Sequence, residues 1–210
     1  MFFEKRLKAA EKSFLKRYPG GFKHPELQAI VKKHHKPKLL ASVQEAFAAS
    51  RFKDTQAVLD SFVKIISQST VVSVFEKTKL RNVAPSLSDT DRKKIVLALK
   101  EMLHGDRLKG FDQLSSQLKP FGVAKWPVLT ALLLYYDAQK EVIIKPTTAK
   151  AVIDFFEVKD LKYTSTPTSS FYKDYRSLIL KMRKMVSPEI APDNGAFSGF
   201  LMMSMEEPVE

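Results

Sequence analysis

Residues 88–105 read SDTDRKKIVLALKEMLHG, and this segment carries the signals of a complete α-helix. Ser88 suits the N-cap position, with Asp91 three residues later in an acidic first turn. Apolar residues from Ile95 to Leu103 recur at helical spacing, and Gly105 follows them at a position where helices commonly end. The segment therefore predicts a helix over about 88–104.

Helical spacing of apolar residues recurs along most of the chain, whereas strict apolar–polar alternation does not. The stretch 70–80, TVVSVFEKTKL, is β-branched but also fits a helix that buries Val71, Val74, Phe75 and Leu80. We expect an all-α, single-domain protein of about nine helices over residues 1–205, with a frayed acidic tail at 206–210. Besides an N-terminal helix before Tyr18, further helices are expected over about 25–35, 38–50, 54–68, 70–80, 107–118, 127–136, 148–157 and 172–186.

Composition excludes several classes of protein. The 210 residues contain no cysteine, which rules out disulfides, thiolate nucleophiles, iron–sulfur clusters and cysteine-ligated zinc. No apolar run approaches the roughly 20 residues of a membrane-spanning helix, so no membrane span is predicted. Charges interrupt the N-terminal segment every few residues, unlike a secretory signal, and we expect a cytoplasmic protein.

Basic residues are concentrated at the N-terminus. Residues 1–38 contain eleven basic and three acidic side chains, a local excess of +8 out of a net charge of +12. In the first helix, Phe3, Leu7, Ala10 and Phe14 share one face and the lysines fall largely elsewhere. Three interpretations stay open: an apolar stripe docked on the core with solvated lysines, contact with nucleic acid, or attachment to a membrane surface.

The most basic piece is Lys32-Lys33-His34-His35-Lys36-Pro37-Lys38. Cations there suit either phosphate contact or the negative end of a helix dipole. As candidate phosphate-contacting residues, the N-terminal region offers Lys12, Lys16, Arg17, Lys32, Lys33 and Lys36.

Recognisable catalytic motifs are absent. The phosphate-binding GxxxxGK[ST] and the dinucleotide-binding GxGxxG do not occur. Residues 195–199, GAFSG, approximate GxSxG, but the first glycine stands one residue too early and no strand precedes it, so Ser198 is not predicted to be a nucleophile. The adjacent His34 and His35 point to different sides of a helix and cannot share a metal. We predict no metal site, no cofactor and no identifiable catalytic residue.

The segment 119–158 contains a KPFGV turn, the helix KWPVLTALL, a loop, and IIKPTT leading into another helix. Together with Pro19-Gly20-Gly21-Phe22 and the stretch from Tyr163 to Leu178, this order resembles a family of bacterial helical proteins that has no assigned function. The resemblance covers most of residues 18–203, patchily.

More distantly, residues 122–158 are similar to the helix-hairpin-helix DNA glycosylase superfamily. There, the backbone N–H groups of a glycine-rich hairpin bind a DNA phosphate. Gly122-Val123 match the start of that hairpin, but Ala124 replaces its second glycine. The loop expected to supply a catalytic Asp reads Ile144-Lys145-Pro146-Thr147. The resemblance therefore implies a DNA-binding relative without the usual catalysis.

Three further residues complete the candidate interface. Lys125 lies within the turn, one residue from the position of the Schiff-base lysine in bifunctional glycosylases. Trp126, the only tryptophan, is either a base-stacking wedge or a core residue. Lys145, held extended by Pro146, either projects into a groove or is a solvated loop lysine.

We predict a nucleic-acid-binding protein, with duplex DNA as the expected partner. The N-terminal cluster would provide the phosphate contacts, and the Gly122–Lys125 turn a secondary anchor. The alternatives are a protein-interaction module that docks through residues 197–205 or the basic first helix, and an unorthodox glycosylase that uses Lys125 or Lys145.

Overall fold

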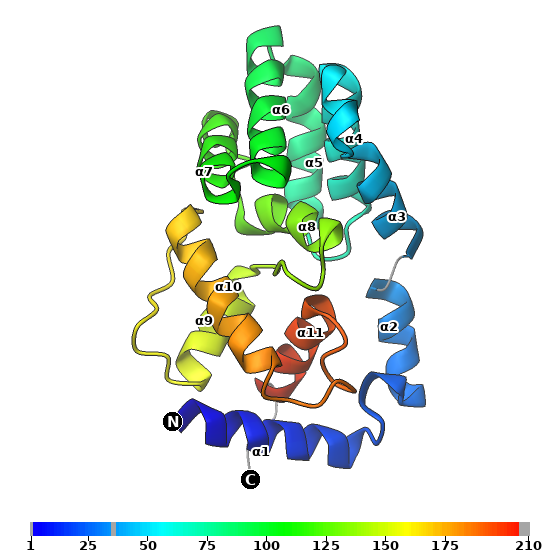
Figure 1. Ribbon diagram of the computed structural model, residues 1–210, viewed down its shortest axis with the longest axis vertical. Helices are drawn as coiled ribbons and strands as arrows, with labels where there is room; N and C mark the ends of the chain where they lie inside the picture. The colour runs from blue at the N-terminus through cyan, green and yellow to red at the C-terminus, as the bar shows by residue number, and fades with distance from the viewer. Residues whose placement is uncertain (1, 35–36, 206–210) are drawn as a thin grey trace.

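The computed structural model describes residues 2–34 and 37–205, and within them the fold is all-α, as expected (Figure 1). Eleven α-helices are described where about nine were predicted. They are α1 (Phe2–Arg17), α2 (Gln28–His34), α3 (Pro37–Ala46), α4 (Thr55–Gln68), α5 (Val74–Val83), α6 (Asp89–His104), α7 (Arg107–Leu118), α8 (Trp126–Tyr136), α9 (Pro146–Phe155), α10 (Ser169–Arg183) and α11 (Asn194–Met205).

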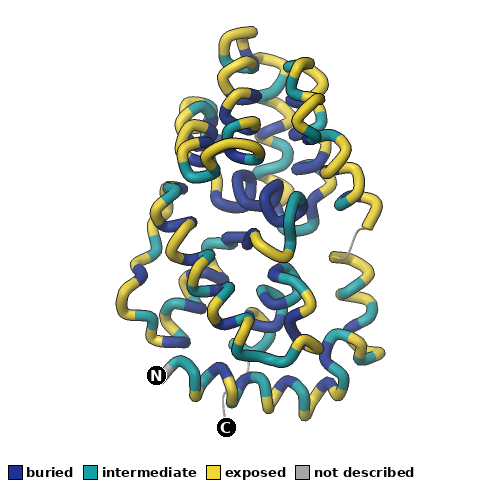
Figure 2. The backbone as a smooth tube through the Cα atoms, in the orientation of Figure 1, coloured by how far each residue is buried: buried dark blue, intermediate teal, exposed yellow. Residues whose placement is uncertain are grey.

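Helix α8 lies at the centre of the molecule. It is apolar on every side, and each of its residues from Trp126 to Tyr135 is buried. A helix without a polar face must be covered all round, and here α3, α4 and α7 pack against it. Figure 1 shows α4–α7 at one end of the molecule and α1 across the other, with α8 between them. Figure 2 shows α8 as a continuous buried segment.

Local caps fix most helix starts. Ser88 Oγ accepts a hydrogen bond from the Asp91 amide, so α6 begins where the sequence predicts. Ser73 and Glu76 form a reciprocal capping box that starts α5 at Val74. The predicted helix over 70–80 therefore begins four residues late.

Two apolar residues at the start of this helix were wrongly predicted to be buried. Val74 and Phe75 were expected in the core, but they are 71% and 87% exposed. Leu80 is buried as expected. The side of α5 that carries Leu80 packs on the core, and the first turn of the helix faces solvent.

The C-terminal segment is part of the core. Asp193 Oδ1 accepts from the Ala196 amide at the start of α11, and Phe197, Phe200 and Leu201 are fully buried. Phe200 packs edge-on against Phe14 of α1, with ring centroids 5.3 Å apart. The interpretation of residues 197–205 as a docking segment for another protein is therefore wrong for its largest side chains.

Helix α1 docks its apolar stripe as predicted. Leu7, Ala10 and Phe14 are buried, and Arg6 donates to the Phe155 carbonyl and pairs with Glu157. Because this apolar face is already covered, it does not offer the free hydrophobic stripe that an interfacial membrane helix needs.

The buried side chains form one contiguous cluster, consistent with a single domain. The predicted tail at 206–210 lies outside the described residues. Within the described ranges, no helix combines the length and apolarity needed to cross a membrane.

Candidate functional site

Four lysines form a row on the exposed side of α1. Lys5, Lys8, Lys12 and Lys16 follow one another at intervals of three or four residues, and all are exposed. This spacing places them on one helix face, and the docked residues Leu7, Ala10 and Phe14 occupy the opposite one. Lys12 and Lys16 were predicted site residues, and Lys5 and Lys8 extend the row.

The row carries little compensating acid. Lys8 Nζ lies 2.7 Å from Glu11 Oε2, while Glu11 Oε1 accepts a hydrogen bond from the Ser187 amide. Within the described ranges, no acidic side chain pairs with Lys5, Lys12 or Lys16. Lys181 of α10 extends the positive surface, because its Nζ lies 5.2 Å from the centre of the Phe3 ring.

The predicted N-terminal cluster divides into two groups. Arg17 stacks over the Tyr18 ring at the end of α1. Lys32 and Lys33 are exposed near the end of α2, which points away from α1 in Figure 1. Lys36 lies outside the described residues.

The turn before α8 has the glycine expected at its sharpest point. Gly122 adopts a left-handed conformation (φ 67°, ψ 22°) that favours glycine. However, the amides of Gly122, Val123 and Lys125 all donate to backbone carbonyls of the turn itself. These three N–H groups already have hydrogen-bond acceptors, so the Gly122 amide is not free to bind a DNA phosphate as predicted. The Lys125 side chain, in contrast, is exposed.

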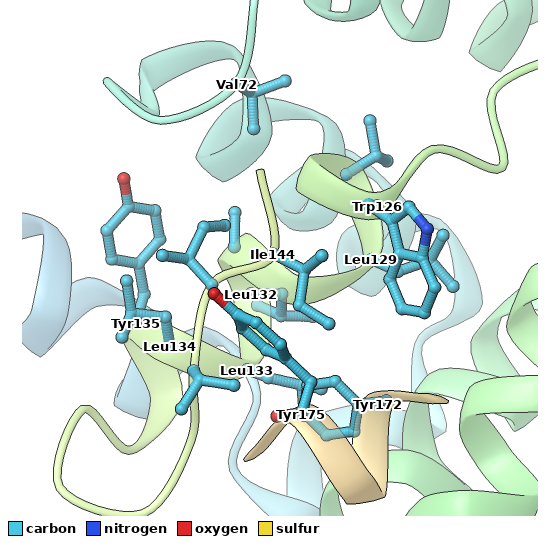
Figure 3. Close-up of a cluster of buried hydrophobic side chains, with 14 of the residues drawn as sticks. Val72, Trp126, Leu129, Leu132, Leu133, Leu134, Tyr135, Ile144, Tyr172 and Tyr175 are labelled. Atoms are coloured by element: carbon cyan, nitrogen blue, oxygen red, sulfur yellow. The ribbon is translucent and has the colours of Figure 1, made fainter. Parts of the chain in front are cut away.

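Trp126 is a core residue. Its side chain is 1% exposed and lies within the cluster of buried side chains drawn in Figure 3. The ring contacts Phe111 and Phe171, and Nε1 donates to the Thr164 carbonyl at 2.8 Å. A base cannot stack on a ring that is already enclosed on its faces and hydrogen-bonded at its edge. The wedge interpretation of Trp126 is therefore wrong, and the core interpretation is confirmed.

Lys145 lies at the start of α9, apart from the other predicted lysines. It has the extended backbone that Pro146 dictates (φ −101°, ψ 124°) and immediately precedes α9. Its half-buried side chain lines a cavity of about 260 Å³ between α2, α8, α9 and α11. The structure thus places the described members of the predicted set in five locations: α1, the end of α2, the turn before α8, the core at Trp126, and this cavity.

Two features of the structure were not predicted from the sequence. One is the cavity, whose lining extends from Phe22 to Met203 and shows no local motif. The other is a buried polar network around Glu141, which is 1% exposed and pairs with Arg107 and Arg176. Burial raises the pKa of Tyr172 well above its usual value, and the nearby Glu141 carboxylate raises it further.

No family model, curated protein or solved structure matches this chain. The two resemblances noted in the sequence therefore remain predictions.

Proposed function

We propose that the protein binds nucleic acid, in the first place duplex DNA, through phosphate contacts from the lysine row of α1. The observation that carries the proposal is the arrangement of Lys5, Lys12 and Lys16, exposed on one helix face without acidic partners among the described residues. A cytoplasmic location fits this proposal.

The dimensions of the row suit a duplex backbone. From Lys5 to Lys16 the helix rises about 16 Å, which corresponds to about five base-pair steps. Docking of the opposite face fixes α1 on the protein surface, so its lysines are presented as a rigid line. Such a surface neutralises phosphates without reading base edges, and the affinity should depend on salt more than on sequence.

A matched pair of triple variants tests the location of the interface. K5Q/K12Q/K16Q removes three charges from α1, and K93Q/K94Q/K100Q removes three from exposed lysines of α6, at the opposite end of the molecule (Figure 1). Fluorescence anisotropy with labelled duplex DNA gives affinity against salt. We expect the α1 variant to lose about 2.7 units of log–log salt slope and the α6 variant to retain most of the wild-type slope.

Two results would contradict the proposal. Equal losses in both variants would show that net charge, and not the α1 row, drives binding. Absence of binding at low salt would remove the nucleic-acid hypothesis altogether.

The variant K32Q/K33Q tests whether the lysines of α2 also contact DNA. A further loss of slope would show that α2 belongs to the same interface, despite its different direction. No loss would confine the interface to α1.

The glycosylase alternative has its own test. Borohydride trapping on abasic duplex, repeated with K125Q and K145Q, would reveal a Schiff base at either lysine. We expect no trapped adduct.

A further inference from the structure

The cavity between α2, α8, α9 and α11 is lined mainly by apolar side chains, among them Ile30, Leu134, Ile143 and Met202. Its volume of about 260 Å³ corresponds to roughly nine groups the size of a water molecule. Ligand pockets of this kind combine apolar walls with a few convergent polar groups, and here two such groups, Lys145 and Thr148, lie at the start of α9.

The N-terminal end of α9 presents three features suited to an anion. Lys145 precedes the helix and has no acidic partner among the described residues. No side chain caps the helix, so the amides of its first turn are not satisfied in that way. Thr148 lines the cavity, is only 6% exposed, and its hydroxyl has no hydrogen-bond partner within the described ranges.

Two other polar side chains that line the cavity have structural roles. Asp193 uses Oδ1 to cap α11, and His34 Nδ1 lies 3.0 Å from Thr70 Oγ1. Lys145 and Thr148 lie three residues apart at the start of α9, and neither side chain has a hydrogen-bond or ion-pair partner among the described residues. The Ser198 hydroxyl on α11 is a third lining group without such a partner.

Two glycines leave space on the opposite wall. Gly195 and Gly199 lie one turn apart on α11 and both line the cavity. Neither has the positive φ that requires glycine. At Gly199 an added Cβ would meet Phe22 at 3.7 Å, an ordinary contact, so alanine would fit and would favour the helix more. What glycine contributes at this position is open space.

We propose that this cavity binds a fatty-acid-type ligand. The carboxylate would contact Lys145, the Thr148 hydroxyl and the first turn of α9, where the helix dipole favours negative charge. The chain would lie against Leu134, Ile143 and Met202. The volume accommodates a chain about the length of octanoate, and the side of the cavity where Ile30 and Met202 are exposed leaves room for the two further carbons of decanoate. This proposal is independent of nucleic-acid binding by α1.

Calorimetric titration with decanoate, octanoate and decanol, all below micelle-forming concentrations, tests the proposal. Decanoate is expected to bind saturably. Octanoate, with two fewer methylenes, should bind about 15-fold more weakly. Decanol, which has the same chain without the charge, should bind at least tenfold more weakly than decanoate.

Four variants separate the head-group site from the chain site. K145Q should weaken decanoate about tenfold and leave decanol unchanged, and T148V should weaken decanoate severalfold. K125Q, at an exposed lysine outside the cavity, should leave decanoate affinity unchanged. G199A should fold normally, as checked by circular dichroism and thermal unfolding, while reducing affinity for both ligands.

Three outcomes would overturn the proposal: no saturable binding of decanoate, equal affinities for decanoate and decanol, or wild-type decanoate affinity in K145Q. Since T148V leaves the α1 lysines and every other candidate DNA-contacting residue intact, its DNA affinity should equal that of the wild type.

Discussion

Tyr172 Oη donates a 2.6 Å hydrogen bond to Glu141 Oε2 and thereby joins α10 to the loop between α8 and α9. Arg107 Nη1 and Arg176 Nε lie 3.1 and 3.3 Å from the same carboxylate, which brings in α7. The Glu141 carbonyl accepts from Asn194 Nδ2 at the start of α11. One buried acid thus links four parts of the chain.

Two tyrosines on α10 provide a matched test of this network. Tyr172→Phe removes the hydrogen bond to a buried charge and should cost about 1.5–3 kcal/mol. Tyr175→Phe removes the hydroxyl of a side chain that is 2% exposed. This hydroxyl has no hydrogen bond within the described ranges, and its loss should cost less than about 0.5 kcal/mol. Urea unfolding measures both. Equal costs would mean that the Glu141 contact contributes nothing specific.

Alkaline pH should destabilise the protein through the same residues. Burial raises the pKa of Tyr172 and of Tyr175 above the unfolded value, which is about 10. Below pH about 10 both states keep these protons and stability is unaffected. Above it, the unfolded chain releases the protons first, so stability falls as pH rises.

The urea midpoint measured from pH about 9 to about 11 reports this fall. Tyr175→Phe should flatten the pH dependence, because one of the tyrosines with a raised pKa is gone. A midpoint that does not change over this range would contradict the prediction.

Local chemistry explains which parts of this fold are predictable from sequence. Ser88 and Gly105 bracket α6 correctly because caps act over a few residues. Lys145 is extended as expected because Pro146 restricts its backbone directly. In each case the determinant lies within the segment itself.

Features set by distant neighbours were not predictable in this way. Val74 and Phe75 face solvent because α5 packs on α4 and buries the side that carries Leu80. Trp126 fits either a wedge or a core position until Phe111 and Phe171 are known to flank it. The cavity joins Phe22 to Met203, and no local spacing encodes a space between distant helices.

Because Phe75 is exposed, we expect its substitution to have little effect on the stability of the fold. Phe75→Ser should change the free energy of unfolding by no more than about 0.5 kcal/mol, because the side chain is 87% exposed. Phe62→Ala, at a fully buried position on α4, should cost about 3–5 kcal/mol. Thermal and urea unfolding of both variants checks the contrast. A large loss in the Phe75 variant would show that this residue is covered in solution.

Deletion of residues 196–210 should unfold the whole protein. It removes Phe197, Phe200 and Leu201, which fill the core beside α1. Deleting residues 206–210 alone retains α11 and serves as the control. Circular dichroism and urea unfolding distinguish the two. A stable, folded product of the longer deletion would restore residues 197–205 as a docking segment.

The enclosed position of Trp126 predicts its spectroscopic behaviour during DNA binding. Trp126 is the only tryptophan, so the tryptophan fluorescence of the protein comes from this residue alone. Its ring is enclosed by Phe111, Phe171 and the Thr164 carbonyl. Iodide should quench its emission only after unfolding in urea, which is the internal control. DNA at low salt should raise the anisotropy of a labelled duplex while the tryptophan emission keeps its wavelength and intensity. Strong quenching by DNA would require the ring to leave the core and stack on a base. That result would support the turn before α8 as part of the DNA interface.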